Sequence, residues 1–324
     1  MNTRNFVARQ DPPLRQHPRE ARLRCLAART VALAVLAACT MVSIGHAADP
    51  EIEEIELTTG DGKTLMATYY QADVEALLDP DEKEEKAEDP DIRQDVVPVM
   101  IFPDWKERAA DYEDLALYLQ SLGHAVIIPN FRAHEAKALT KDDIIGMIKF
   151  DAEAVKNFLI EKNDEKELNV DKICLIGVQL GGLVALNWAV KDWSWPQLLR
   201  GKQGQDVKAL ILVSPLTTRS GVKADAAFLH PAVRAKLSYL LLVGNEDKRA
   251  FSHTNKIYGR LKRFNTTEPP DKKLFLFPHE TSLQGLDLLE QDDLKSKNRR
   301  YIELFIKSRI VDQKHRWQKR GADS

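Results

Sequence analysis

From residue 96 onward, apolar segments of strand length alternate with longer amphipathic segments, and this alternation limits the possible folds more than any other feature of the sequence. Residues 96–102 form a continuous apolar run, as expected for a strand buried on both faces. Similar runs follow at 125–129, 173–177, 207–213, 239–243 and 274–277. Helical periodicity separates the runs, for example over residues 144–159. The sequence therefore predicts an α/β fold with a mostly parallel central sheet and helices on both faces.

A hairpin pattern and a charged insertion precede this alternation. Residues 52–59 alternate in polarity, a glycine-rich turn follows, and residues 64–71 continue as an extended segment. The pattern predicts an N-terminal antiparallel hairpin, which makes the sheet mixed. Residues 73–95 are acidic and lack a core pattern, which indicates a solvated, flexible insertion. Because residues 312–324 form a polar tail, the predicted folded domain spans residues 48–311.

Residues 1–47 have the features of an export signal. Several arginines precede an uncharged apolar run over residues 30–44, and Gly45-His46-Ala47 offers small residues for cleavage. The apolar run is too short for a comfortable membrane span. We therefore expect cleavage of a signal peptide near Ala47 and export to the periplasm or the medium, with no integral span in the mature chain.

Two alternatives remain for this N-terminal segment. Leu36-Ala37-Ala38-Cys39 resembles a bacterial lipobox, in which case Cys39 would become the first mature residue and carry a lipid anchor. The other alternative is a signal that is never cleaved and serves as a permanent N-terminal anchor. The first alternative would make the chain a lipoprotein.

The charge and cysteine content exclude several classes of function. The chain has 47 Lys and Arg against 49 Asp and Glu; without the seven Arg and two acidic residues of positions 1–47, 40 basic and 47 acidic residues remain, a net charge of −7. Such an acidic body argues against non-specific nucleic-acid binding. Cleavage near Ala47 would leave Cys174 as the only cysteine, hence no internal disulfide. We see no metal-ligand spacing and no cofactor motif.

The segment Gly177-Val178-Gln179-Leu180-Gly181 follows an apolar strand pattern and precedes a helix rich in small residues. It resembles the nucleophile elbow, Gly-x-Ser-x-Gly, of the α/β-hydrolases. In that family the glycines allow strand and helix to approach closely around a strained turn. Gln179 stands where those enzymes have their nucleophile.

Other segments extend this resemblance over roughly residues 50–310. Asp247 follows the strand at 239–243, as the family's acid does, and Gln284 takes the position of the family's histidine. The order 179–247–284 is the family's order. Phe102-Pro103-Asp104-Trp105 occupies the place of the oxyanion loop. The chain thus resembles bacterial α/β-hydrolases of the dienelactone-hydrolase-like or serine-aminopeptidase-like type, which implies the α/β-hydrolase fold.

The departures from the family pattern argue against hydrolysis. The amide of Gln179 is not a nucleophile, and the amide of Gln284 cannot take and return a proton near neutral pH. We expect Asp247 to accept a hydrogen bond from Gln284 instead. The N–H groups of Leu180 and Trp105 are the candidate oxyanion donors, but a carboxylate at Asp104 would oppose an oxyanion there.

Two further features leave alternatives open. His279, five residues before Gln284, is either a substitute base or a surface histidine at the end of a strand. Trp193 and Trp195 either form a lid or cover the sheet edge.

The favoured hypothesis is an exported, non-catalytic protein that binds an unknown small molecule or an envelope protein, or serves a structural role in the envelope. The alternative is an active esterase or peptidase with a non-standard site.

Overall fold

The computed structural model describes residues 51–78, 90–196, 201–267 and 271–321. By contacts the chain divides into Met1–His46 and Ala47–Ser324, and every described residue belongs to the second unit. The predicted signal peptide, its cleavage site and the lipobox at Cys39 therefore lie outside the described residues. Residues 79–89 of the acidic insertion lie outside them too.

An eight-stranded mixed sheet forms the centre of the molecule, in the order β1-β2-β4-β3-β5-β6-β9-β10. The hairpin strands β1 and β2 are antiparallel, β2 pairs antiparallel with β4, and all later neighbours are parallel. This confirms the predicted mostly parallel sheet with an N-terminal hairpin. The strands are β1 (Ile52–Thr58), β2 (Thr64–Tyr70), β3 (Val97–Phe102), β4 (His124–Pro129), β5 (Ile173–Val178), β6 (Val207–Val213), β9 (Ser238–Gly244) and β10 (Leu274–His279).

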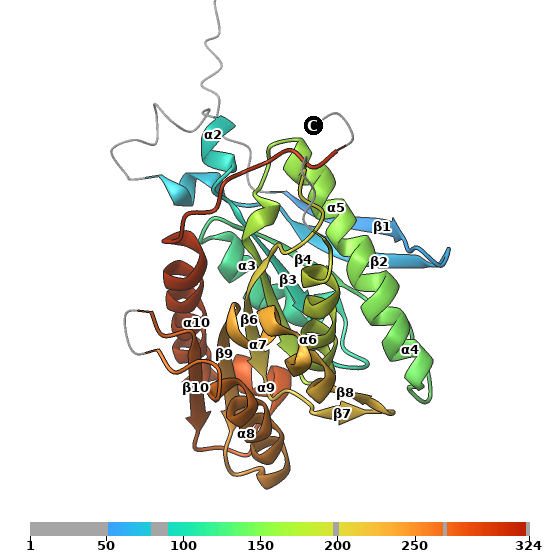
Figure 1. Cartoon of the computed structure of the whole chain (residues 1–324), viewed down its shortest axis with the longest axis vertical. Helices are drawn as coiled ribbons and strands as arrows, with labels where there is room; N and C mark the ends of the chain where they lie inside the picture. The colour runs from blue at the N-terminus through green and yellow to red at the C-terminus, as the bar shows by residue number, and fades with distance from the viewer. Residues whose placement is uncertain (1–50, 79–89, 197–200, 268–270, 322–324) are drawn as a thin grey trace, which may run out of the picture. The chain divides into compact units, whose positions relative to one another are not determined.

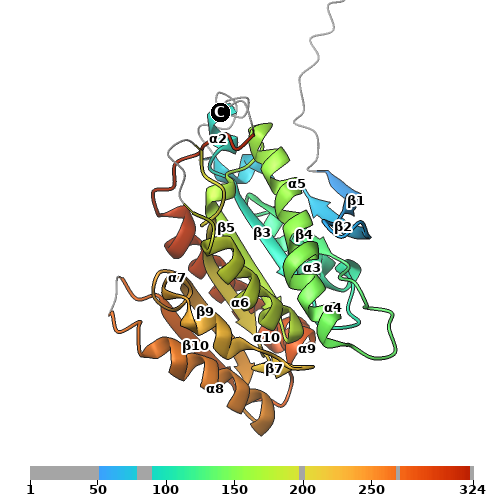
Figure 2. The same ribbon diagram turned by 45° about the vertical axis from the view of Figure 1, so that its right-hand side comes forward.

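Helices cover both faces of the sheet, as predicted (Figures 1 and 2). One face packs against α4 (Lys141–Gly146), α5 (Ala152–Asp164), α6 (Leu180–Trp193), α7 (Pro231–Ala235) and α8 (Lys248–Lys262). The other face packs against α3 (Glu113–Gln120), α9 (Gly285–Glu290) and α10 (Asp292–Ile306). The remaining short helices are η1 (Val74–Leu77), α2 (Pro90–Arg93), η2 (Ala109–Tyr112), η3 (Met147–Asp151), η4 (Val170–Lys172), η5 (Ala224–Leu229) and η6 (Lys307–Val311). Within the described ranges no helix combines the length and apolar character that crossing a bilayer requires.

The continuous apolar strands serve two cores at once. Met100 and Phe102 of β3 pack into the core under α5 and α6, whereas Val99 and Ile101 pack into the core under α3 and α10. Successive side chains of a strand point to opposite faces, so a strand covered on both sides needs an apolar residue at every position. This is the physical reason for the unbroken apolar runs in the sequence.

Local details differ from the sequence-based expectation. The helix predicted over residues 144–159 is longer and consists of α4, a π-helical turn at η3, and α5. A short hairpin, β7 (Thr218–Arg219) and β8 (Val222–Lys223), was not expected. Its turn places Ser220 and Gly221 at φ values of 44° and 84°, and such paired positive φ values are typical of tight hairpin turns.

The polar tail is attached to the domain along residues 312–321. Figure 1 shows this segment crossing from α10 toward the end of α5. The Arg320 backbone N–H donates to Asp164 Oδ1 at 2.7 Å, and Asn163 Nδ2 donates to the Gln318 carbonyl at 2.9 Å. The Arg320 side chain is 2% exposed and pairs with the fully buried Asp206 at 2.6 Å. Lys156 contacts the same carboxylate at 2.9 Å, so the tail completes a buried charge cluster.

We predict that Arg320→Ala destabilises the protein by about 3 kcal/mol, because removing one member of a buried ion pair leaves its partner under-compensated. Urea denaturation followed by circular dichroism measures the change. Lys319→Ala is the matched control, since Lys319 is the exposed neighbour of Arg320, and it should change stability by less than about 0.5 kcal/mol. Equal effects of the two substitutions would contradict the buried cluster.

Candidate functional site

The turn between β5 and α6 has the strained geometry of a nucleophile elbow. Gln179 has a φ of 45° and a ψ of −103°, a backbone conformation that non-glycine residues rarely adopt. Its backbone N–H donates to the Val213 carbonyl at 2.9 Å, and its carbonyl accepts from Leu216 N–H at 3.2 Å. A Cβ on Gly181 would lie 1.9 Å from the Phe102 carbonyl oxygen, so α6 can approach β3 only with glycine there.

A cleft of about 400 Å³ opens at this elbow. It gathers all the predicted site residues except His279, namely Asp104, Trp105, Gln179, Leu180, Asp247 and Gln284. Its other lining residues are Ser214, Leu216, Arg219, Arg249, Ala250 and His253. These side chains come from the loops and helix starts that follow the carboxyl ends of the strands, and from β7, at the end of the sheet where open α/β folds place their ligands.

The Asp104 carboxylate occupies the position that an oxyanion would take. The Leu180 backbone N–H donates to Asp104 Oδ1 at 2.9 Å. Burial raises the pKa of Asp104, and hydrogen bonds from the Leu180 and Trp105 amides oppose that rise. Both candidate oxyanion donors therefore already serve a side chain of the protein itself.

A second carboxylate holds Asp104 in place. The Asp104 backbone N–H donates to Glu107 Oε2 at 3.0 Å, and the Tyr112 hydroxyl donates to the same oxygen. Burial raises the pKa of Glu107, with a contribution from the like charge of Asp104. Two neighbouring carboxylates at this loop make it an unfavourable place for additional negative charge.

Gln284 is fixed by the backbone and by Ser214. Its Oε1 accepts from Ser214 Oγ at 2.6 Å, and its Nε2 donates to the Gly244 carbonyl at 2.9 Å. The Gly285 backbone N–H completes the arrangement by donating to Ser214 Oγ at 3.1 Å. The Gln284 amide and the Ser214 hydroxyl thus have hydrogen-bond partners within the protein and need none from a ligand.

The expected bond between Gln284 and Asp247 is not formed. Asp247 is instead the N-cap of α8, where its Oδ1 accepts from the backbone N–H groups of Arg249 at 2.8 Å and Ala250 at 3.0 Å. Such a cap satisfies the free donors at a helix start. The retained acid therefore has a structural role in this chain.

His279 lies away from the cleft, so it cannot act there as a base. It is 3% exposed, its ring centroid is 6.3 Å from that of Tyr301 in α10, and burial lowers its pKa. The reading of His279 as a surface histidine is equally wrong. The side chains of neighbouring strand residues alternate between faces, and the side chain of His279 belongs to the α10 face.

His253 is the histidine of the cleft, and sequence reasoning missed it. Its Nδ1 accepts from the Thr217 backbone N–H at 3.1 Å and lies 2.5 Å from Thr217 Oγ1. Burial lowers the pKa of His253, and the nearby cations Lys256 and Arg249 lower it further. In the sequence, only the position of His253 six residues after Asp247 could have suggested that this histidine lies near the site.

Arg219 was also missed, because the hairpin that carries it was not predicted. The guanidinium lies 5.2 Å from the centroid of the Trp105 ring, and its charge lowers the pKa of Asp104. The hairpin is anchored by Ser220 Oγ, which donates to the Leu139 carbonyl at 2.8 Å. The cleft entrance thus has a cation stacked on an aromatic wall.

Trp193 does not form a lid. It ends α6, which is 14 residues long, and so lies about 20 Å from the elbow. Its Nε1 donates to the Val207 carbonyl at 2.9 Å, at the start of β6. Trp193 therefore packs at the amino end of β6, which lies between β5 and β9, so it does not cover an edge strand of the sheet either. Trp195, two residues later, is 39% exposed.

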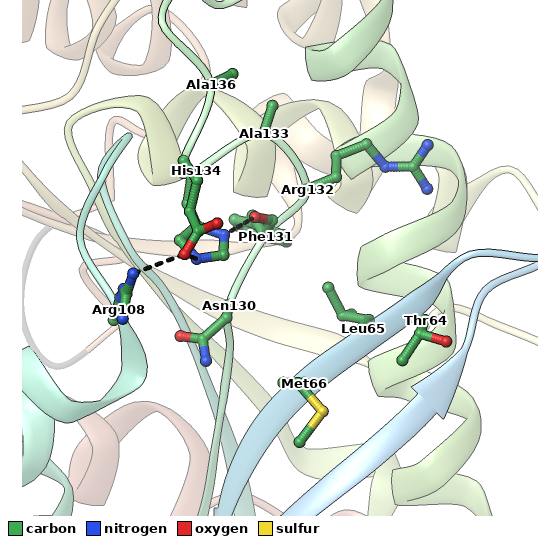
Figure 3. A pocket seen from close by; sticks show the side chains of 11 residues that line it. Thr64, Leu65, Met66, Arg108, Asn130, Phe131, Arg132, Ala133, His134 and Ala136 are labelled. Atoms are coloured by element: carbon green, nitrogen blue, oxygen red, sulfur yellow. Dashed lines mark hydrogen bonds and ion pairs between the residues drawn. The ribbon is translucent and has the colours of Figure 1, made fainter. Parts of the chain in front are cut away.

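A second cavity, of about 420 Å³, lies beside the loop after β4 (Figure 3). His134 turns toward the Phe131 carbonyl, as Figure 3 shows, and its Nδ1 is bonded to that oxygen at 3.0 Å. Arg108 pairs with Glu135 at 2.8 Å. The Trp105 indole N–H donates to the Ala133 carbonyl at 3.0 Å, which connects this loop to the cleft. His134 thus supports its loop. Among the described residues, no three His, Cys, Asp or Glu side chains are grouped as metal ligands would be.

Comparison with known proteins gives a structural likeness only. No family model and no curated relative matches the sequence. An esterase from Pyrococcus furiosus superposes with a TM-score of 0.54 at 15% identity, covering 81% of this chain and 92% of that one. An α/β-hydrolase from a Medee basin deep-sea metagenome library superposes with a TM-score of 0.53 at 16% identity. The match covers 81% of this chain and 99% of that one.

An esterase from the fungus Rhizomucor miehei gives a TM-score of 0.55 at 11% identity, over 80% of this chain and 82% of that one. At such low identities, the superpositions show a shared fold and not a shared chemistry. Together with the strand order and the strained turn at Gln179, they lead to one conclusion. The chain has the α/β-hydrolase fold.

Proposed function

We propose that this protein is a non-catalytic member of the α/β-hydrolase fold that binds a small molecule in the cleft at the elbow. The observation that carries the proposal is the bond from Leu180 N–H to the Asp104 carboxylate. An enzyme of this fold needs that donor free for the oxygen that becomes negative during the reaction. Here the donor is committed to a carboxylate, next to a glutamine at the nucleophile position.

The two glutamines remove the remaining chemistry. Gln179 offers no oxygen or sulfur nucleophile, and Gln284 offers no titratable nitrogen. The bonds of Gln284 to Ser214 and Gly244 keep its amide fixed without any proton transfer. Nucleophile, base and oxyanion hole are thus all replaced, and each loss alone would lower activity by orders of magnitude.

The open cleft supports ligand binding over a purely structural role. Its volume of about 400 Å³ falls in the range of small-molecule sites. Its walls combine the Trp105 ring, the Leu216 side chain and the amide of Gln179 with the cation Arg219. We further propose, from residues 1–47 alone, that a bacterial cell exports the chain to its periplasm or surroundings, with lipidation of Cys39 as the alternative route.

One contact favours a second candidate, an active esterase or peptidase with a non-standard site. Thr217 Oγ1 lies 2.5 Å from His253 Nδ1, which is hydrogen-bond distance between a hydroxyl and a base. The lowered pKa of His253 keeps its ring neutral at pH 7. Against this candidate, Thr217 is not among the residues that line the elbow cleft.

We predict that the wild-type protein neither reacts with a fluorophosphonate probe nor hydrolyses short activated esters. Gln179→Ser with Gln284→His should also stay inactive, because Asp104 still fills the oxyanion hole. Adding Asp104→Ala frees the Leu180 N–H and should raise ester hydrolysis by at least about 100-fold, the usual worth of one oxyanion donor. Initial rates with p-nitrophenyl acetate measure this.

Labelling of the wild type at Thr217, abolished by Thr217→Val or His253→Gln, would instead establish the second candidate. Thr218→Val is the control for Thr217→Val, because Thr218 is the exposed neighbour on the same hairpin. Equal activity of the double and triple variants would refute the role assigned to Asp104.

We predict a pH-dependent stability difference for Asp104→Asn. Burial raises the pKa of the Asp104 carboxyl in the folded state, so the wild type is relatively most stable below the unfolded-state pKa and loses that stability as pH rises through the folded-state pKa. Asparagine keeps an acceptor for Leu180 N–H but carries no charge. The stability of Asp104→Asn relative to wild type should therefore increase from pH 4 to pH 7 in urea denaturation.

Asp114→Asn is the control of opposite sign. A hydrogen bond from Lys295 lowers the pKa of Asp114, so its stabilisation is present above the unfolded-state pKa and is lost as pH falls through the folded-state pKa. Its removal should cost stability at pH 7, and the cost should shrink as pH falls below the unfolded-state pKa. The same pH trend for both variants would contradict the buried environment of Asp104.

A further inference from the structure

A separate cavity of about 410 Å³ lies beside α8. It opens between α8, η5 and the β7–β8 hairpin, and its lining shares no residue with the elbow cleft. The lining residues are Thr217, Thr218, Lys223, Ala224, Asp225, Phe228, Asn255, Lys256, Ile257, Gly259, Arg260 and Arg263.

The rim of this cavity is strongly basic. Four of its lining side chains are cations and one is an acid, Asp225, which lies 3.3 Å from Arg260. Residues 248–263 hold six Lys and Arg and no Asp or Glu. In the part of the chain that the structure describes, no ion pair involves Lys223, Lys256 or Arg263. Three cations therefore face one cavity on a body whose sequence is acidic overall.

The floor and the walls are suited to an organic molecule. Buried Ala224, Phe228 and Ile257 form an apolar floor. The Asn255 amide at the wall is a donor that suits phosphate or sugar oxygens, whereas the hydroxyls of Thr217 and Thr218 already contact His253 and the Val222 carbonyl. An apolar floor beneath a cationic rim suits a ligand that has both a carbon part and negative charge.

Gly259 keeps the cavity open. It lies inside α8, where glycine is less favourable than alanine for helix formation. A Cβ at Gly259 would meet no atom within 4 Å, so no close packing of the protein requires glycine there. A side chain at this position would extend from the helix into the space beside the rim.

We infer that this cavity binds a small organic molecule that carries two phosphate groups. A terminal phosphate has a charge of about −1.5 to −2 at pH 7 and a bridged inner phosphate about −1, so a diphosphate carries about −3. This charge matches the three cations that form no ion pair among the described residues, beside Arg260, which Asp225 partly neutralises. Guanidinium groups bind phosphate in a bidentate manner, and lysines add point charges. The apolar floor would contact the carbon part of the ligand. This inference is independent of the proposed function of the elbow cleft.

The test is isothermal titration of the full-length protein with ADP and pyrophosphate, with adenosine as the uncharged control. ADP and pyrophosphate should bind, adenosine should not, and the affinity should fall as salt is raised. Lys256→Gln combined with Arg263→Gln should weaken ADP binding at least tenfold. Lys248→Gln, on the same helix but outside the cavity, should leave it unchanged.

Gly259 gives a second, geometric test. Gly259→Leu should fill the space and abolish ADP binding, whereas Gly259→Ala should retain it, and both substitutions favour the helix. Thermal denaturation confirms that both variants fold. Absence of binding by both ADP and pyrophosphate, unchanged binding in Gly259→Leu, or binding only to vesicles of anionic lipid would overturn the inference. None of these outcomes changes the activity assays that test the elbow cleft.

Discussion

The close approach of α6 to the middle of the sheet is the constraint on which the rest of the site depends. Glycines at 177, 181 and 182 leave no side chain between helix and strand, and a Cβ on Gly177 would lie 2.5 Å from the Gly182 Cα. The chain must therefore turn sharply at Gln179, with a positive φ. This turn directs the Leu180 N–H into the cleft and places Gln179 at the cleft wall. The strained turn is thus present with a glutamine at its centre.

The same constraint explains why Asp104 is so well placed. A backbone N–H at a helix start needs an acceptor, and in this chain the loop after β3 supplies one from its own side chain. Glu107 and Tyr112 then hold that loop from behind. Leu180, Asp104, Glu107 and Tyr112 thus form one polar network whose bonds lie within the protein. A carboxylate buried there is tolerated because two amides bond to it.

The site could be predicted in part. The positions of Gln179, Asp247 and Gln284 were expected from the resemblance of their segments to the elbow, acid and histidine positions of the α/β-hydrolases, and the cleft does gather them. The partners of these side chains did not follow. Asp247 caps α8 and Gln284 bonds to Ser214, because capping geometry and the path of a loop depend on neighbours far away in sequence. The cleft residues His253 and Arg219 had no local signal at all.

The sequence by itself determined the layered architecture, because strands buried on both faces require unbroken apolar runs and amphipathic helices require a period of 3.6 residues. It also determined the elbow, because only glycine permits that close approach. Tertiary structure alone decided that His279 belongs to the α10 face, that Arg320 enters a buried charge cluster, and that the cations of α8 border a cavity. These outcomes depend on contacts between side chains that are far apart in the sequence, and local periodicity carries no information about such contacts.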